Sequence, residues 1–478
     1  MPSKSQTDLV WLHTYNEFLY FIAQSMFDLI VIGGGSAGVR TARIAASLGA
    51  KVAIAEEKHW GGTCVNVGCV PKKLYHYLSG FKYQLKTAEA YGWGVDFTYP
   101  NWSDFQDKKN HEIHRLNRIY TDMLKNAGCT LLEGHAKIVS DSAIEIGGQR
   151  YDCKHMVIAV GAKPSFPSIE GIEHTLSSDD LFYTEALPEK LLVVGGGYIG
   201  CEFASIYCAL DTQVTVATRS DILGGFDRES VDFLKQEMAL KGISFKTGFT
   251  PVSIVKQEDG GLRVTFDCGT CEIYDAVLMA TGRVPLFENL GVECLDLKIN
   301  DQGLIDVDEN FETCCPGVFA IGDIIDYPDL TPAALAQGMY VAKYLFAEGE
   351  HDQPDLKHIA TAIFTHPQMS CMGLSEECVS EQELDADVYV SRFKHLKYSV
   401  TKIDTYTYIK LICEPNNGKI LGIQIVGEEV GEIMQGFSAL MVAGVTKRQM
   451  DRTIGIHPTV AEELVTLREP TRCHRFNH

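Results

Sequence analysis

A glycine-rich turn directly after a buried strand constrains this sequence more than any other feature. Residues 27–32 form an apolar run of strand length, and the glycines after it have GxGxxG spacing: Gly33, Gly35 and Gly38. Residues 36–48 have a helical pattern, and the next apolar run, 51–55, ends at Glu56. Such glycines let backbone N–H groups meet a pyrophosphate at a helix start, and such an acid binds ribose hydroxyls. The order of these elements therefore predicts a Rossmann-type dinucleotide-binding domain.

The same order of elements occurs a second time, from residue 191. The glycines after the strand 191–194 repeat the spacing: Gly195, Gly197 and Gly200. A helix to about residue 210 and a strand over 213–217 follow. That strand leads to Thr218 and Arg219 instead of an acid, which suits the 2′-phosphate of NADPH better than the ribose of NADH. Two such domains imply two dinucleotides, most simply a flavin and a nicotinamide.

Three further short apolar strands run into glycine, as expected where ligands meet the carboxyl ends of parallel strands. The residues at these strand ends are Gly161, Gly282 with Arg283, and Asp323. Asp323 is the one acid among them, so it could bind a polar ribityl chain. The alternative for Asp323 is a turn-forming or helix-capping role.

Two of the fifteen cysteines lie in a special context, the segment GGTCVNVGCVPKK over residues 61–73. On an ideal helix, residues five apart are separated by about 7.5 Å of rise, and a disulfide needs Cα atoms within about 7 Å. A Cys64–Cys69 disulfide therefore requires a distorted turn, which Gly68 would permit. A strained disulfide is easily reduced, which is typical of a catalytic bond. The other cysteines are expected to be free thiols in a reducing compartment, so we predict a cytoplasmic protein.

Composition excludes several classes of function. Apolar residues make up 45% and charged residues 22%, as in an ordinary globular protein. The net charge of −21 argues against nucleic acid or an anionic membrane as partner. No apolar stretch approaches the roughly 20 residues of a membrane span. Residues 1–26 contain one Lys and no Arg, so we expect a peripheral arm, or an upstream start carried in from the reading frame, instead of a transit peptide.

These motifs, together with the segment IHPTVAEE at 456–463, resemble the glutathione reductases, a branch of the FAD-dependent pyridine nucleotide–disulfide oxidoreductase family. The resemblance runs from about residue 27 to 468 and implies an α/β fold with two Rossmann-like domains and an α+β dimerisation domain. The implied divisions are an N-terminal arm (1–26), an FAD-binding domain (27–163), an NADPH-binding domain (164–285), a central domain that completes the FAD site (286–356) and an interface domain (357–478). The resemblance also implies a homodimer.

The resemblance implies that electrons pass from NADPH through FAD to Cys64–Cys69 and then to a disulfide substrate. Cys69 matches the cysteine that contacts the flavin, and Cys64 matches the thiol that attacks the substrate. His457, from the other subunit, matches the general acid–base, and Glu462 would orient it. The alternative is that Thr459 and Glu462 form only a helix capping box.

Other positions match cofactor-binding residues of the family. Lys72 matches a lysine near the flavin ring, with Glu202 as its ionic partner, and Tyr198 matches an aromatic gate over the nicotinamide pocket. Arg283 matches a residue near NADPH, and Thr331 matches a residue near the flavin. The remaining cofactor matches are Ser36, Gly62 and Thr63. No metal is expected.

The substrate matches point to oxidised glutathione. They are Ser36, Arg40, Arg43, Tyr120 and His457, with Arg43 matching a carboxylate ligand. Two departures occur, because Met339 and Gly224 replace arginines that bind substrate and the 2′-phosphate. A modified substrate such as glutathione amide disulfide, and use of NADH, therefore stay open. A dihydrolipoamide dehydrogenase-like enzyme and a silent FAD-bearing assembly subunit are further alternatives.

Overall fold

The computed structural model of the chain describes residues 26–476 except 97, 99, 357 and 416. The predicted arm thus lies, except for Met26, outside the described residues. The described residues form two compact units. The first comprises 26–70, 110–163 and 283–356, and the second comprises 71–109, 164–282 and 357–476.

The first unit is built around a seven-stranded sheet, counted over its described residues, with the order β3-β2-β1-β6-β5-β4 and β16 joined to β6. Its strands are β1 (Phe27–Ile32), β2 (Val52–Glu56), β3 (Thr130–Glu133), β4 (Lys137–Ser140), β5 (Ala143–Ile146), β6 (Gln149–Ile158) and β16 (Val318–Ala320). The pairs β3–β2, β2–β1, β1–β6 and β6–β16 are parallel, and β5 and β4 extend the sheet from β6 in antiparallel pairs. Leu29, Ile30 and Val31 of β1 are fully buried, as expected for a parallel strand covered on both faces.

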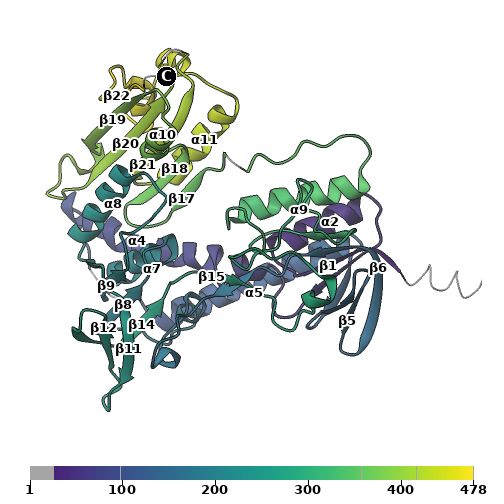
Figure 1. Cartoon of the computed structure of the whole chain (residues 1–478). Helices are drawn as coiled ribbons and strands as arrows, with labels where there is room; N and C mark the ends of the chain where they lie inside the picture. The colour runs from purple at the N-terminus through teal and green to yellow at the C-terminus, as the bar shows by residue number, and fades with distance from the viewer. Residues whose placement is uncertain (1–25, 97, 99, 357, 416, 477–478) are drawn as a thin grey trace, which may run out of the picture. The chain divides into compact units, whose positions relative to one another are not determined.

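Two helices of the first unit lie side by side over β1, as Figure 1 shows: α2 (Ser36–Ser47) and α9 (Thr331–Phe346). Their close packing requires glycine, because a Cβ on Gly338 would lie 2.6 Å from the Ala37 carbonyl oxygen. The other helices that reach this unit are α3 (Gly62–Asn66), α4 (Cys69–Ala90), α5 (Trp102–Asn126) and η2 (Val292–Leu295). A short pair, β7 (Ala162–Pro164) and β15 (Arg283–Pro285), marks where the chain changes unit.

The second unit contains the second Rossmann-type fold. Its four-stranded parallel sheet has the order β10-β9-β8-β14, and an antiparallel sheet β11-β12-β13 accompanies it. The strands are β8 (Lys190–Val194), β9 (Gln213–Thr218), β10 (Ser244–Thr247), β11 (Pro251–Lys256), β12 (Leu262–Phe266), β13 (Cys271–Tyr274) and β14 (Ala276–Met279). The helices are α6 (Ser178–Leu181), α7 (Tyr198–Ala209), α8 (Arg228–Leu240) and η1 (Ile172–His174).

The C-terminal part of the second unit is an antiparallel sheet with the order β17-β18-β21-β20-β19-β22. Its strands are β17 (Thr361–Ile363), β18 (Gln368–Gly373), β19 (Ala386–Lys394), β20 (Tyr406–Cys413), β21 (Ile420–Gly427) and β22 (Arg472–His474). The helices are α10 (Glu376–Glu381), η3 (Leu396–Tyr398), α11 (Val430–Val442), α12 (Lys447–Asp451) and α13 (Glu463–Thr466). The predicted α/β class with an α+β C-terminal part is confirmed.

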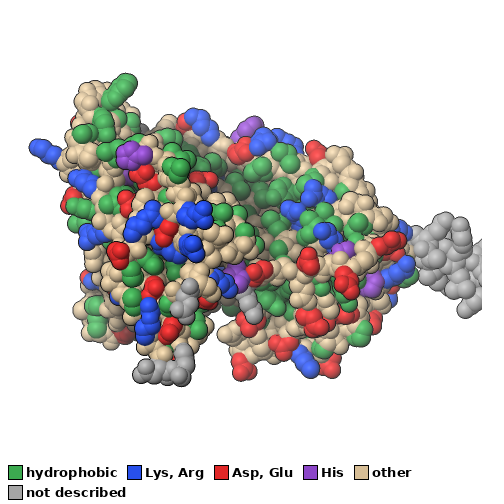
Figure 2. All heavy atoms as spheres, turned by 90° about the horizontal axis from the view of Figure 1, so that it is seen from above, with side chains coloured by type: hydrophobic (Ala, Val, Ile, Leu, Met, Phe, Trp, Pro, Cys, Tyr) green, Lys and Arg blue, Asp and Glu red, His purple; other side chains and the backbone are tan. Residues whose placement is uncertain are grey.

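Charge is dispersed over the surface. On the face shown in Figure 2, Lys and Arg side chains are intermixed with Asp and Glu, so the net charge of −21 is not gathered in one block there. Within the described part of the chain, no helix is both long and apolar enough to cross a membrane.

One ionic cluster is completely enclosed in the second unit. The side chains of Lys410 (β20) and Asp227, which caps α8, are both 0% exposed and lie 2.9 Å apart. The ammonium group also lies 2.9 Å from carboxylates of Glu229 and Glu376. Burial alone would lower the pKa of Lys410, but these carboxylates raise it, so the lysine keeps its charge. The cluster therefore ties the second Rossmann-type fold to the C-terminal sheet within this unit.

We expect Lys410→Met to destabilise the protein by about 3–5 kcal/mol, because it leaves the buried Asp227 carboxylate without its cation. Chemical denaturation followed by fluorescence measures the loss. The matched control is Lys108→Met, since Lys108 pairs with Asp104 at an exposed site with side chains 73% and 55% accessible; it should cost less than about 1 kcal/mol. Equal losses in the two variants would show that the cluster contributes no more than a surface pair.

Candidate active site

The first glycine turn has the geometry of a dinucleotide cradle. Gly33 has φ +108°, and a Cβ there would lie 2.2 Å from the Ala159 carbonyl oxygen. A Cβ on Gly38 would lie 1.9 Å from the carbonyl oxygen of Gly33. No side chain caps the N-terminus of α2 at Gly35, so its N–H groups can meet an anion. Glu56 at the end of β2 accepts a 2.6 Å hydrogen bond from the N–H of Gly34, which places its carboxylate beside the turn.

The second glycine turn repeats this construction. Gly195 has φ +116°, and its Cβ would lie 2.2 Å from the Ala280 carbonyl oxygen. The helix α7 begins at Tyr198 after Gly197, again without a side-chain cap, and Tyr198 is 40% exposed. At the end of β9 the Thr218 hydroxyl donates to the Ser220 carbonyl oxygen, and Arg219 is exposed. Both turns thus fit the pyrophosphate of a dinucleotide.

The two cysteines meet because the helix between them is interrupted. The helix α3 ends at Asn66 and α4 starts at Cys69, with Val67 at φ −139° and ψ 34° between them. A Cβ on Gly68 would lie 2.8 Å from the Thr63 carbonyl oxygen, so a larger residue would force this turn apart. Both sulfurs are thiols in this structure, and that of Cys64 is hydrogen-bonded to Cys69. The predicted distorted turn at Gly68 is confirmed.

The environments of the two thiols differ. The hydrogen bond with Cys69, together with burial, raises the pKa of Cys64. Cys69 lies at the N-terminus of α9, with its sulfur 3.6 Å from the Thr331 hydroxyl. The positive end of that helix dipole faces the sulfur and favours negative charge there. The two thiols therefore differ in environment: the pKa of Cys64 is raised, and Cys69 lies beside the first residue of α9.

A buried amide, Asn66, and a half-buried one, Asn117, hold this segment, and the sequence did not single them out. Asn66, inside the cysteine loop, donates to the Gly62 carbonyl oxygen at 2.8 Å. Asn117 of α5 donates to the Asn66 side-chain oxygen at 2.9 Å and to the Trp60 carbonyl oxygen at 2.8 Å. In the sequence, Asn117 is only a polar residue in an amphipathic helix, and that pattern does not indicate that it contacts Asn66 or Trp60.

Predicted substrate residues of the first unit lie near the thiols. Burial raises the pKa of Tyr120, and the charges of Cys64 and Cys69 add to that effect while Arg40 opposes it. Tyr120 is therefore close enough to all three to feel their charges. Arg40 and Arg43 are half-buried on α2, one turn apart, and Ser36 is its first residue. The structure thus gathers Tyr120, Arg40 and the dithiol within one unit.

The predicted Lys72–Glu202 pair forms in the second unit, with 2.7 Å between ammonium nitrogen and carboxylate oxygen. The side chains are 13% and 4% exposed. Glu202 also accepts from the backbone N–H of Phe364 at 2.8 Å, and the Lys72 nitrogen lies 4.0 Å from the Phe364 ring centre. Phe364 therefore also supports the Lys72–Glu202 pair. The sequence did not reveal this, because the residues around Phe364 give no sign of a contact with Lys72 on α4.

Asp323 lies in a buried region after β16. Burial raises its pKa, and the charge of Arg283 opposes that shift. The guanidinium of Arg283 donates to the Ala162 carbonyl oxygen in the first unit. Gly161 and Gly282 have φ values of +70° and +118°, which suit glycine in the turns that follow these strands. A nearby amide, Gln337, accepts from the Gly322 N–H at 2.8 Å and supports this turn.

His457 and Glu462 form a directed pair. The imidazole Nδ1 lies 2.9 Å from one Glu462 carboxylate oxygen and 3.2 Å from the other. The His457 side chain is 82% exposed and that of Glu462 is 18% exposed. The Glu462 N–H donates to the Thr459 hydroxyl at 3.2 Å. This is one of the two hydrogen bonds of the capping box that the sequence offered as the alternative role. A carboxylate at Nδ1 favours the tautomer with its proton there and leaves Nε2 as the exposed basic nitrogen.

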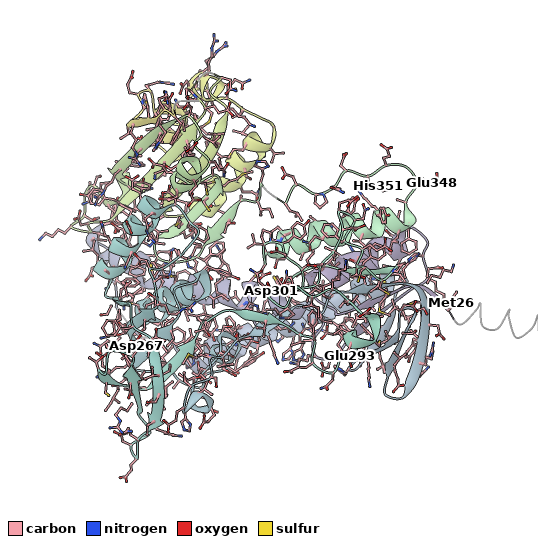
Figure 3. The ribbon with its side chains drawn as sticks, viewed as in Figure 1. Met26, Asp267, Glu293, Asp301, Glu348 and His351 are labelled. Atoms are coloured by element: carbon pink, nitrogen blue, oxygen red, sulfur yellow. The ribbon has the colours of Figure 1, made fainter. Side chains whose placement is uncertain are left out.

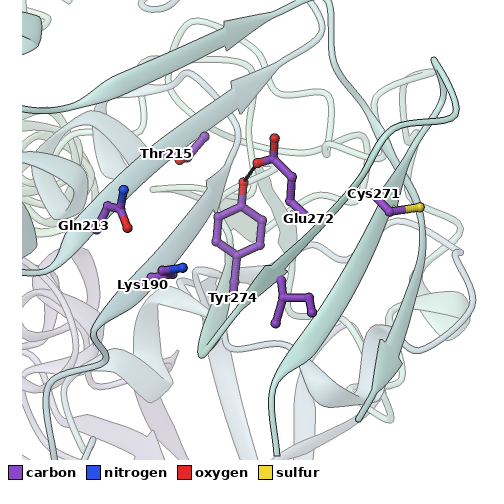
Figure 4. Close-up of a pocket in the computed structure, with 7 residues that line it drawn as sticks. Lys190, Gln213, Thr215, Cys271, Glu272 and Tyr274 are labelled. Carbon is purple, nitrogen blue, oxygen red and sulfur yellow. Dashed lines mark hydrogen bonds between the residues drawn. The ribbon is translucent and has the colours of Figure 1, made fainter.

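The predicted residues are divided between the two units. The first unit holds the dithiol, the first glycine turn and its substrate residues, and the second holds the second turn, Lys72–Glu202 and His457–Glu462. A cavity of about 380 Å³ lies elsewhere in the second unit, between β8, β9 and β13, and contains none of the predicted site residues (Figure 4).

Comparisons with known proteins agree with this geometry. Residues 27–338 match the family described as pyridine nucleotide-disulphide oxidoreductase, and residues 359–468 match its dimerisation domain. A protein of Pisum sativum named "Glutathione reductase, chloroplastic/mitochondrial" is 41% identical over 94% of this chain and 84% of its own length. Proteins named glutathione reductase from Burkholderia cepacia and a Nostoc species are each 38% identical over 92% of this chain and 98% and 99% of their own lengths.

Two dinucleotide cradles and a dithiol at a helix N-terminus define a class of protein, the oxidoreductases that exchange electrons between a dinucleotide and a disulfide. The chain belongs to the pyridine nucleotide-disulphide oxidoreductase family. The family prediction and the prediction of an oxidoreductase are confirmed. The dimerisation domain supports formation of a homodimer.

We expect Gly68→Ala to slow closure of the Cys64–Cys69 disulfide at least tenfold, because the added Cβ would contact the Thr63 carbonyl oxygen at 2.8 Å. Stopped-flow oxidation of the reduced protein, followed by thiol counting, measures closure. Gly436→Ala is the control, since a Cβ at that helical position meets nothing within 4 Å. Unchanged closure in Gly68→Ala would mean that the turn tolerates a side chain.

Proposed function

We propose that this protein catalyses the NADPH-dependent reduction of glutathione disulfide to glutathione. The observation that carries the proposal is the Cys64–Cys69 thiol pair, hydrogen-bonded at the N-terminus of α9 in a chain with two dinucleotide cradles. The relatives named glutathione reductase, which this chain matches over almost its whole length, support the same substrate. We also propose that the FAD-binding, NADPH-binding, central and interface domains meet at residues 163/164, 285/286 and 356/357.

FAD at the first glycine turn and NADPH at the second supply, when bound, the electrons that reduce the Cys64–Cys69 disulfide. The residues that would hold FAD include Glu56, Asp323 and Thr331. Those that would hold NADPH include Tyr198 and Arg219. Lys72, paired with Glu202, matches the lysine that lies near the flavin ring in the family.

The raised pKa of Cys64 makes a base necessary. The contact with Cys69 and burial raise the pKa of Cys64, so its thiol becomes a nucleophile only when a base removes the proton. His457 has an exposed side chain whose Nδ1 is held by the Glu462 carboxylate, which leaves Nε2 for proton transfer. In the proposed reaction, Nε2 takes the proton, Cys64 attacks one sulfur of the substrate, and the proton returns to the departing thiolate. Cys69 then attacks Cys64 and releases the second thiol.

We propose that His457 acts in the site of the partner subunit of a homodimer. Support comes from its position in the dimerisation domain and from its 82% exposed side chain, which is oriented by Glu462. Glu462 is a positioning residue because it contacts the imidazole and not the substrate.

Arg40, Arg43 and Tyr120 suit an anionic peptide disulfide. Two basic residues lie on α2 in the unit that holds the dithiol, and they would offset the repulsion of a chain with net charge −21. Met339, a half-buried residue of α9, offers no charge to the substrate. Fifteen cysteines without a disulfide among the described residues fit a reducing compartment, and we propose the cytoplasm.

The test is NADPH oxidation by the purified flavoprotein with oxidised glutathione, glutathione amide disulfide, trypanothione disulfide and lipoamide. We expect the highest kcat/KM with oxidised glutathione. Cys64→Ser should abolish turnover while retaining the flavin, because the attacking thiol is lost. Cys129→Ser is the control, since Cys129 is a buried thiol that contacts the Ala42 carbonyl oxygen. Full turnover in Cys64→Ser, or a preference for lipoamide, would refute the proposal.

Arg219→Ala should lower kcat/KM for NADPH by about 10- to 100-fold, the effect of losing a charged hydrogen bond worth about 1.5–3 kcal/mol. The value for NADH should stay within twofold, because NADH has no 2′-phosphate. Steady-state kinetics with both coenzymes measure the two changes. Arg263→Ala, an exposed position on β12, is the control. An equal fall in kcat/KM for NADPH and NADH would show that Arg219 does not contact the 2′-phosphate.

A further inference from the structure

The segment Phe364-Thr365-His366, between β17 and β18, contacts both members of the Lys72–Glu202 pair. The Phe364 N–H donates to a Glu202 carboxylate oxygen at 2.8 Å, and the same oxygen lies 2.7 Å from the Lys72 nitrogen. That nitrogen lies 4.0 Å from the centre of the Phe364 ring, which is cation–π distance. One residue therefore holds the carboxylate with its backbone and the ammonium group with its side chain.

A second ammonium group lies over the same ring. The Lys73 nitrogen is 3.7 Å from the centre of the Phe364 ring. Burial lowers the pKa of Lys73, the charge of Glu429 opposes that shift, and the charge of Lys72 adds to it. Two like charges thus meet at one aromatic ring, whose quadrupole attracts both. A side chain without a ring at this position would leave their repulsion without that compensation.

His366 anchors the other end of the segment to two helices. Its backbone N–H donates to the Ser205 hydroxyl at 2.7 Å, and its Nε2 lies 2.8 Å from the Ser79 hydroxyl. Its ring stacks on that of His76, with 4.3 Å between the ring centres and 12° between the planes. Ser79 and His76 belong to α4, and Ser205 belongs, with Glu202, to α7. The segment that carries Phe364 is therefore fixed to both helices of the ion pair.

The stacked histidines add no charge beside the lysines. Burial, together with the charges of Lys73 and Lys72, lowers the pKa of His76 to about 4. Burial also lowers the pKa of His366 well below its usual range, so both rings are neutral at physiological pH. A Cβ on Gly80 would lie 3.2 Å from Cε1 of His366, which shows how closely α4 approaches the segment. The ring of Phe364 is thus held against the lysines by packing.

The contacts join two parts of the chain that match different family models. Phe364 lies within residues 359–468, which match the dimerisation domain, whereas Lys72 and Glu202 lie within residues 27–338. We propose that Phe364 is a positioning residue, supplied by the dimerisation domain, that fixes the Lys72 ammonium group and thereby raises the midpoint potential of the bound flavin. The inference rests on the proposed function and on the match of Lys72 to the family's lysine near the flavin ring. Charge beside a flavin changes the stability of its reduced form.

The test measures the midpoint potential of the flavin in the purified full-length flavoprotein by dye-equilibrium titration. Phe364→Leu and Phe364→Met should both shift the potential to more negative values, because the cation loses its ring contact. Lys72→Met should shift it further in the same direction, because the charge itself is lost. Phe364→Tyr keeps an aromatic ring and should retain the wild-type potential. Chemical denaturation checks that each variant is folded.

A matched control exists in the same unit. The Lys246 nitrogen lies 5.1 Å from the centre of the Phe249 ring and 2.7 Å from a Glu272 carboxylate oxygen, so ring, lysine and glutamate recur there. Phe249 and Phe364 are both half-buried. The control precedes Thr250, whose carbonyl oxygen accepts a 2.9 Å hydrogen bond from the N–H of Asp267, labelled in Figure 3. Phe249→Leu should leave the flavin potential unchanged.

The double variant Phe364→Leu/Lys72→Met shows whether Phe364 acts through Lys72. In the Lys72→Met background, Phe364→Leu should change the potential by less than about half of its effect in the wild type, since interacting residues are not additive. Fully additive shifts, or an equal shift in Phe249→Leu, would refute the inference. A wild-type potential in Phe364→Leu, with a shift in Lys72→Met, would refute it and leave the proposed function intact. A wild-type potential in Lys72→Met would refute both the inference and the proposed place of Lys72, whereas turnover of oxidised glutathione tests the proposed function separately.

Discussion

The approach of Gly68 to the Thr63 carbonyl oxygen is the constraint on which the redox site depends. A continuous helix would carry Cys64 and Cys69 on different faces and separate them along the axis. A backbone without Cβ at position 68 allows α3 to end and α4 to begin within two residues. The sulfurs then meet, and α9 directs its N-terminus at the second of them. The chemistry proposed for this protein therefore depends on the absence of a Cβ at Gly68.

The local electrostatic environment gives side chains of the same type different pKa values. The pKa of Cys64 is raised, whereas Cys69 lies beside the first residue of α9. The same principle holds for cations, since Lys410 stays charged in a fully buried position only because three carboxylates surround it. Neighbouring dipoles and charges, more than residue type, decide reactivity here.

Much of the architecture could be predicted because it depends on local sequence. A strand followed by glycines at fixed spacing needs no distant partner to be recognised, and both turns have the expected positive φ at Gly33 and Gly195. The dipeptide Asn417-Gly418 is likewise typical of a hairpin turn, and the apolar residues 408–413 and 420–426 on either side of it lie within β20 and β21. Asn117, Phe364 and Lys410 were not predicted, because each acts through residues that are 51, 162 and up to 183 positions away.

The sequence by itself determined the two dinucleotide folds, the position of the redox cysteines and the membership of a family. These features rest on backbone stereochemistry, where a glycine or its absence decides which turn is possible. Only the tertiary structure decided that the pKa of Cys64 is raised and which helix begins beside Cys69. Those properties depend on hydrogen bonds, burial and charges brought together from distant segments, and a thiol has no fixed pKa until its neighbours are in place.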